Sequence, residues 1–112
     1  SDSAIRYQIL SVLKKFPTLP SYVLRIVEKA ANDPANSAAA RTAAVFILLK
    51  NDRISWEDAE KRLSGFSGNE SELLPLYVTF SPDGGAELIK KCASSEQEDL
   101  KLLAAWAVLK NL

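Results

Sequence analysis

Apolar residues recur along almost the whole chain at the spacing of an amphipathic α-helix. In the first segment they follow the pattern i, i+4, i+7, i+8, i+11, at Ile5, Ile9, Val12, Leu13 and Phe16. We therefore predict a helix from about Ser3 to Lys15 that turns one face to the core and ends before Pro17. A second helix is predicted after Pro20, with its core stripe at Val23, Ile26, Val27 and Ala30.

The next two helices differ in how much of their surface is apolar. The sequence Asn32-Asp33-Pro34 ends the second helix and begins a third, predicted from about Pro34 to Lys50. Its run from Ala43 to Leu49 is apolar on every side, as expected for a helix surrounded by others. Ser55 then begins a short, half-exposed helix as its capping residue, and Gly65 ends that helix.

The segment between Asn69 and Phe80 is ambiguous. Its residues from Leu76 onward have strand propensity, and Pro75 disturbs the interior of a helix. A period of about 30 residues favours a helix, because one apolar pattern occurs three times at that interval. The matching positions are Ala43, Ala44, Phe46, Ile47 and Leu48, then Leu73, Leu74, Leu76, Tyr77 and Val78, then Leu103, Ala104, Trp106, Ala107 and Val108. We predict a helix here, since a lone strand would have no edge to pair with.

The last 30 residues give the clearest unit. A helix is predicted from Pro82 to Ala93, and Ser95 with Glu98 predicts a capping box for another helix that runs from Glu96 toward Leu112. Three helix ends also share nearly the same four residues, Val12-Leu13-Lys14-Lys15, Leu48-Leu49-Lys50-Asn51 and Val108-Leu109-Lys110-Asn111. These recurrences indicate a stack of similar helical units.

The run from Gly84 to Ile89, the Ser94-Ser95-Glu96 turn and the run from Leu103 to Leu109 resemble the armadillo repeat. The looser earlier units are similar to its relative, the HEAT repeat. The resemblance is clearest over residues 84–112. It implies an all-α fold, a right-handed α-solenoid of about three repeats, whose second helices line a groove for a partner peptide or helix.

The alternative fold is a closed bundle of six or seven helices, an adaptor of the death-domain class. The two folds differ at the C-terminal helix, because a solenoid would expose Trp106 and Leu109 and a closed bundle would bury them. In either case residues 1–112 are expected to form a single helical domain. The polar opening and the apolar helix that ends at Leu112 suggest a fragment of a larger protein.

A candidate binding surface follows from side chains four residues apart on the predicted groove helices. The four pairs are Leu10 with Lys14, Phe46 with Lys50, Leu76 with Phe80, and Trp106 with Lys110. We expect an apolar floor with ammonium groups beside it, suited to an acidic and partly hydrophobic partner segment. The competing interpretation is that the lysines only stabilise helix C-termini and the aromatic rings only fill the core. Peptide-binding armadillo proteins commonly keep Asn four residues after Trp, where this chain has Lys110, so their asparagine ladder is not expected.

The composition limits the classes of partner and of chemistry that we expect for the chain. Fourteen Lys and Arg balance fourteen Asp and Glu, and no basic run exceeds two residues, so nucleic acid is the weaker alternative partner. The chain has no His, which removes the common nucleophile pairs and the commonest zinc ligand, so we expect no enzyme, no metal site and no cofactor. Cys92, the single cysteine, is expected to be a buried and inert thiol.

No apolar stretch has the roughly 20 residues that a membrane span requires, and a single cysteine fits a reducing compartment. We therefore predict an intracellular, cytoplasmic or nuclear, protein-protein interaction scaffold without catalytic activity. Its apolar C-terminal helix also favours homo-association.

Overall fold

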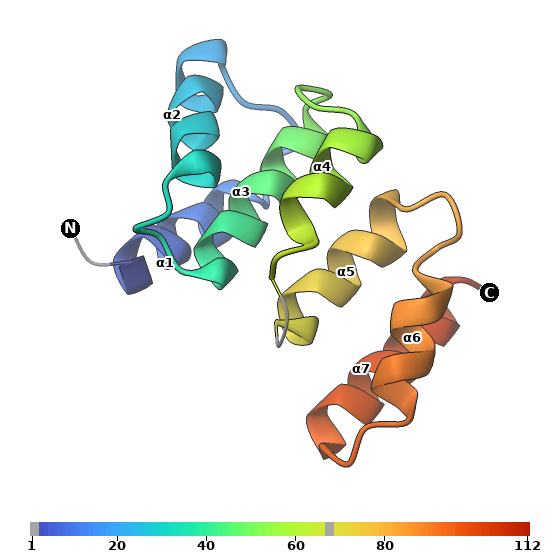
Figure 1. The fold of residues 1–112 in the computed structure, drawn as a ribbon. Helices are drawn as coiled ribbons and strands as arrows, with labels where there is room; N and C mark the ends of the chain where they lie inside the picture. Colours follow the sequence, from blue (N-terminus) through green and yellow to red (C-terminus); the bar gives the residue numbers. More distant parts are fainter. Residues whose placement is uncertain (1–2, 67–68) are drawn as a thin grey trace. The chain divides into compact units, whose positions relative to one another are not determined.

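The structure is a computed structural model, and it describes residues 3–66 and 69–112. Within these residues it consists of seven α-helices and no strand, so the prediction of an all-α chain is confirmed (Figure 1). The helices are α1 (Ser3–Leu13), α2 (Ser21–Asn32), α3 (Ala38–Lys50), α4 (Trp56–Leu63), α5 (Glu70–Phe80), α6 (Ala86–Ala93) and α7 (Glu98–Lys110).

The chain divides into two compact units, Ser1–Phe66 and Ser67–Leu112, which we call the N-terminal unit and the C-terminal unit. The N-terminal unit contains α1 to α4, and the C-terminal unit contains α5 to α7. The expectation that both belong to one repeat domain stays a prediction.

Helix α3 is the centre of the N-terminal unit, and α1, α2 and α4 pack against it (Figure 1). Eight of its residues are buried, as predicted for a helix that is apolar on every side. The helix begins at Ala38, so the predicted start at Pro34 was wrong. The Ser37 hydroxyl accepts a hydrogen bond from the Ala40 N–H at 3.1 Å and caps the helix at this later point.

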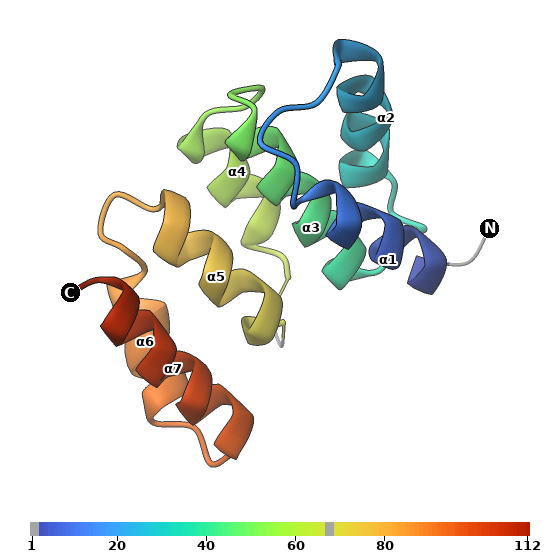
Figure 2. The ribbon, with the colours of Figure 1, turned by 180° about the vertical axis from the view of Figure 1, so that it is seen from behind.

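The buried amide of Asn36 ties the start of α1 to the end of α2. Its Oδ1 accepts a hydrogen bond from the Arg6 guanidinium, and its Nδ2 donates to the Ala30 carbonyl at 3.0 Å. Arg6 also lies 3.6 Å from the Asp33 carboxylate. The two helices therefore meet at this end, and they diverge toward the linker that joins them (Figures 1 and 2).

Asn51, the residue after α3, anchors the linker between α1 and α2. Its Oδ1 accepts a hydrogen bond from the Leu19 N–H at 3.1 Å, and its Nδ2 donates to the Ile47 carbonyl at 2.8 Å. One side chain thus satisfies a backbone donor in the linker and an acceptor in the last turn of α3.

The C-terminal unit contains the segment that was ambiguous in sequence. The predicted helix is confirmed as α5, with Pro75 inside it. The Thr79 hydroxyl donates a hydrogen bond to the Pro75 carbonyl at 2.8 Å. Helices α5, α6 and α7 pack together around a core whose buried members are Leu74, Val78, Cys92, Ala104 and Ala107. The prediction that Cys92 is buried is confirmed.

Helix α6 begins at Ala86, four residues later than predicted from Pro82. Gly84 and Gly85 have positive φ angles of 66° and 79°, and the Asp83 carboxylate accepts a hydrogen bond from the Gly85 N–H at 3.0 Å. This turn occupies the positions where the helix was predicted to start. Glycine suits them because other residues rarely adopt positive φ.

Helix α7 begins at Glu98, and the capping box predicted from Ser95 was wrong. The Ser95 hydroxyl accepts a hydrogen bond from the Gln97 N–H at 3.1 Å, two residues on, where a cap would accept from the third residue. Serine therefore forms a turn before the helix, and Gln97 precedes the first helical residue without a side-chain cap.

Candidate partner-binding site

The predicted site residues of the N-terminal unit come together near the end of α1. The Nζ of Lys14 lies 4.5 Å from the centre of the Phe46 ring in α3, and the Nζ of Lys50 donates a hydrogen bond to the Lys14 carbonyl at 2.7 Å. Leu10 is buried. Both ammonium groups therefore have partners within the unit.

The four predicted site residues of the C-terminal unit differ in exposure. Leu76 is fully buried and Phe80 partly buried on α5, whereas Trp106 is 40% exposed and Lys110 is exposed on α7. We leave the buried Leu76 and Leu10 out of the site proposed below, because a partner cannot reach them. That the eight residues line one surface stays a prediction.

An open apolar groove of about 430 Å³, which we did not predict from sequence, lies between α1 and α2. Its apolar lining is Ile9, Leu10 and Leu13 from α1 and Val23, Ile26, Val27 and Ala30 from α2. The apolar stripes of these helices were predicted to face the core, yet Ile9 is 55% exposed and Ile26 is 63% exposed. Val27 is buried as predicted, and the other buried positions are Leu10 on α1 and Leu24 and Ala31 on α2.

One signal for the groove was present in the sequence. Helix α1 carries Leu10 in addition to the stripe of Ile5, Ile9 and Val12, so it is apolar on more than one side. One neighbouring helix covers only one side of such a helix. The remaining apolar side is then exposed or covered by a partner.

The groove has a charged end and an apolar end. Where α1 and α2 meet, its lining includes Arg6, Lys29, Asp33 and Asn36. At the other end the lining is apolar, with Leu13 from α1 and Val23 from α2. A ligand with a charged start and a bulky apolar end would match this order.

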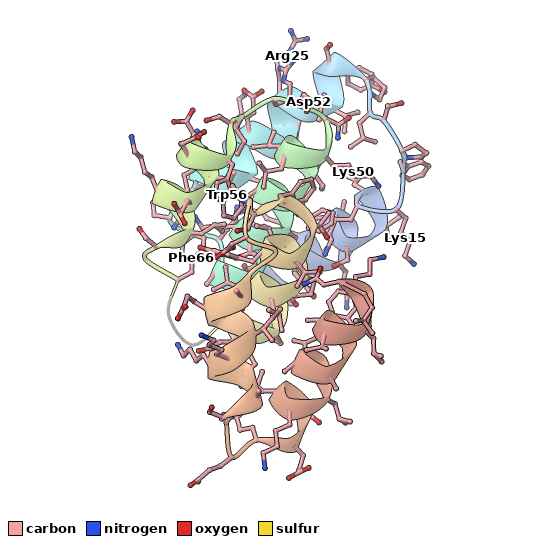
Figure 3. The ribbon with its side chains drawn as sticks, turned by 90° about the vertical axis from the view of Figure 1, so that its right-hand side faces the viewer. Lys15, Arg25, Lys50, Asp52, Trp56 and Phe66 are labelled. Carbon is pink, nitrogen blue, oxygen red and sulfur yellow. The ribbon has the colours of Figure 1, made fainter. Side chains whose placement is uncertain are left out.

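The two units carry opposite net charges that the total conceals. The N-terminal unit has ten Lys and Arg against seven Asp and Glu, a net charge of +3, and the C-terminal unit has four against seven, a net charge of −3. Lys15 and Arg25 project from the N-terminal unit (Figure 3), and Lys29 is exposed at the charged end of the groove. The N-terminal unit therefore favours a negatively charged partner.

The C-terminal unit exposes an apolar helix face. Leu102, Trp106 and Leu109 follow the spacing i, i+4, i+7 and so share one side of α7. The two leucines are each 69% exposed. Glu98, one turn before Leu102, is exposed on the same side.

A polar hollow of about 480 Å³ in the C-terminal unit is lined in part by Glu70, Lys91 and Cys92. The Lys91 ammonium lies 3.0 Å from the Glu70 carboxylate, and this hydrogen bond holds the pKa of Glu70 below its ordinary value. Burial raises the pKa of Cys92, and the nearby Glu70 charge adds to that rise. The thiol is therefore kept protonated, the opposite of an activated nucleophile. In the part of the chain that the structure describes, no group of acidic or cysteine side chains is arranged to hold a metal ion.

Comparison with family models, with curated proteins and with solved structures gives no match for this chain. Among the helices of residues 3–66 and 69–112, none combines the length and the apolar character needed to cross a membrane.

Proposed function

We propose that the chain is a non-catalytic protein-protein interaction scaffold of the armadillo or HEAT kind, a solenoid of helical hairpins. The alternation of helix character supports this proposal, because α2, α4 and α6 bury one side each while α3 and α5 are apolar around most of their circumference. The exposure of Trp106 and Leu109 also supports a solenoid, in which the last helix is not covered on that side.

The proposed contact surface is the groove between α1 and α2, and the observation that carries it is the exposed apolar lining at Ile9 and Ile26. The lining residues recur every three or four positions on each helix, so the groove presents two rows of side chains with a channel between them. An amphipathic helix binds such a channel by its apolar face. The exposed Lys29 at the charged end favours a helix with acidic residues in its first turn, whereas Arg6 already pairs with Asp33.

The pairs predicted from sequence are less suited to a partner. The Lys50 ammonium already donates to a backbone carbonyl, and Lys14 already lies over the Phe46 ring. Nucleic acid is also less favoured, because two cations of the N-terminal unit are paired with carboxylates. Arg6 lies 3.6 Å from Asp33, and Arg53 lies 2.9 Å from Glu28.

Binding of a synthetic helical peptide, followed by fluorescence anisotropy, tests this function. The probe is a fluorescein-labelled helix of about four turns with leucines at i, i+3, i+7 and i+10 and glutamates in its first turn. A control peptide has the same composition with its leucines spread around the helix. Because the contact is small, we expect a Kd of about 10 to 100 µM for the probe and weaker binding of the control peptide.

Two variants locate the contact. Ile26→Glu adds a charge to the apolar lining and should weaken probe binding by at least about tenfold, and Lys29→Glu should weaken it by about three- to tenfold and reduce its salt dependence. Val108→Glu is the matched control, since Val108 is an exposed apolar residue of the C-terminal unit. Equal binding of the two peptides, or unchanged binding by the Ile26→Glu variant, would show that this groove is not the site.

A further inference from the structure

The chain contains a helix face that matches the proposed groove in length. The exposed side of α7 from Glu98 to Leu109 spans eleven residues, about 16 Å along the helix axis. Val23 and Asp33, which bound the groove lining on the α2 side, are ten residues apart, about 15 Å. The exposed side of α7, from its acidic start to Leu109, is therefore about as long as the groove that would receive it.

An internal comparison indicates that this face of α7 lacks a covering helix. Sixty residues earlier, the equivalent side of α3 has Thr42 and Leu49 buried and Phe46 partly buried. Helices α5 and α6 pack against α7 but leave the corresponding side exposed, at Leu102, Trp106 and Leu109. The same repeat position is thus satisfied in one unit and open in the other.

The order of charged and bulky residues along α7 also matches the order of residues along the groove. Its first turn is acidic, with Glu98 on the exposed side and Asp99 beside it, and the bulky Trp106 lies two turns later. The groove has Arg6 and Lys29 in the lining of its charged end and Leu13 and Val23 in the lining of its apolar end. The net charges of the two units, +3 and −3, act in the same direction.

We infer that α7 of one copy of the chain docks into the α1–α2 groove of a second copy, with its acidic start at the Arg6 and Lys29 end. This inference rests on the proposed function, because the groove must first accept a helix. The contact joins two unlike surfaces and leaves one of each unused in every pair. Association therefore continues to longer head-to-tail assemblies or closes into a ring. Two short helix faces give a small interface, so we expect a Kd of roughly 100 µM.

Sedimentation velocity of the full chain and of two blocked variants tests the head-to-tail contact. Ile26→Glu blocks the groove and keeps α7 intact, whereas Leu102→Glu blocks α7 and keeps the groove. Both side chains are exposed, so the substitutions should leave the helical content and the melting temperature close to those of the native chain. Val108→Glu is again the matched control, because Val108 lies about 120° around α7 from Leu102.

From about 5 to about 500 µM the native chain and the Val108→Glu variant should increase in mean mass, and each blocked variant alone should stay monomeric. An equimolar mixture of the two blocked variants should form dimers and stop there, since it contains one usable groove and one usable α7 per pair. A monomeric native chain at about 500 µM overturns the inference. So does a blocked variant that still self-associates, or a mixture that stays monomeric.

Charge reversal gives a second test. Lys29→Glu and Glu98→Lys should each weaken association about three- to tenfold, and the double variant should return to within about twofold of the native chain. Failure of the double variant to recover overturns the proposed orientation. The peptide assay separates the two proposals. If the acidic helical peptide binds the native chain and not the Ile26→Glu variant while the chain stays monomeric, only the self-association is wrong. If the peptide does not bind the native chain, the proposed function is wrong as well.

Discussion

Replacing Asn51 with Ala should destabilise the N-terminal unit, mainly because one backbone N–H in the linker, that of Leu19, loses its hydrogen-bond acceptor. In the folded unit the Asn51 side chain accepts a hydrogen bond from the Leu19 N–H and donates one to the Ile47 carbonyl. Alanine removes both bonds. The Ile47 carbonyl keeps a hydrogen bond from the Asn51 N–H at 3.1 Å, whereas the partly buried Leu19 N–H loses the acceptor that Asn51 supplied.

The expected loss follows from these two bonds. A partly buried donor without a partner costs about 1 to 2 kcal/mol, and the lost bond to a carbonyl that keeps another donor costs about 0.5 kcal/mol. The free energy of unfolding should therefore fall by about 2 kcal/mol. For a unit of this size that corresponds to a melting temperature lower by roughly 8 to 16 °C.

Urea denaturation followed by tryptophan fluorescence can read the two units separately. Trp56 lies in the N-terminal unit and Trp106 in the C-terminal unit, so a Trp106→Phe background reports on the first alone. Asn111→Ala in a Trp56→Phe background is the matched control, because Asn111 follows α7 as Asn51 follows α3. The Asn111 side chain makes a longer contact, 3.4 Å to the Gly84 carbonyl, and is exposed, so we expect a loss below about 0.5 kcal/mol. Equal losses in the two variants would refute the reasoning.

Three further predictions concern the C-terminal unit and its turns. Gly85→Ala should lower the free energy of unfolding by about 1 to 3 kcal/mol in urea denaturation, because φ is 79° and the added Cβ would lie 3.1 Å from another side-chain carbon. Gly65→Ala is the control and should not lower the free energy of unfolding, because an added Cβ would have no atom within 4 Å. The Cys92 thiol should react with an aromatic disulfide only as fast as the unit opens, and immediate modification of the native chain would contradict its burial. Since the pKa of Glu70 is lowered from 4.5, its pairing with Lys91 stabilises the fold above that pH and is lost as the pH falls through the lowered value. The Lys91→Met variant should therefore lose less than about 1 kcal/mol at neutral pH and show a flatter decline in acid, and an unchanged acid decline would count against the pairing.

The helices could be predicted from the sequence because, in most segments, the local spacing of apolar residues and the 30-residue recurrence both indicate a helix. The instructive exception is α5, where local propensity favoured a strand and Pro75 opposed a helix. The prediction from the 30-residue period was correct, because α5 is a helix that buries Leu74 and Val78 in a core shared with α6 and α7, and this burial outweighs local preference.

Helix starts were harder to predict, because short polar side chains can bond to several nearby backbone groups. Ser37 and Ser55 accept from the third residue on and cap α3 and α4. Ser95 accepts from the second residue on and forms a turn instead. The residue type is the same in all three places, and the conformation of the preceding loop decides between the two bonds.

The second apolar side of α1 was visible in the sequence, but the position of the groove could not be predicted, because an apolar stripe indicates a side that favours burial without showing what covers it. Ile9 and Ile26 follow the same periodic pattern as core residues, and both are exposed in the folded N-terminal unit. Core and docking surfaces have the same composition at this level. Only the arrangement of α1, α2 and α3 separates them.

The buried Asn36 amide has a consequence for how tightly the groove can bind. By bonding to Arg6 and to the Ala30 carbonyl it holds α1 and α2 at one end, so the channel is already open before any ligand arrives. A preorganised channel spares an incoming helix the entropic cost of ordering the receptor. A substitution of the buried Asn36, which lies at the charged end of the groove, can therefore change the affinity for a ligand.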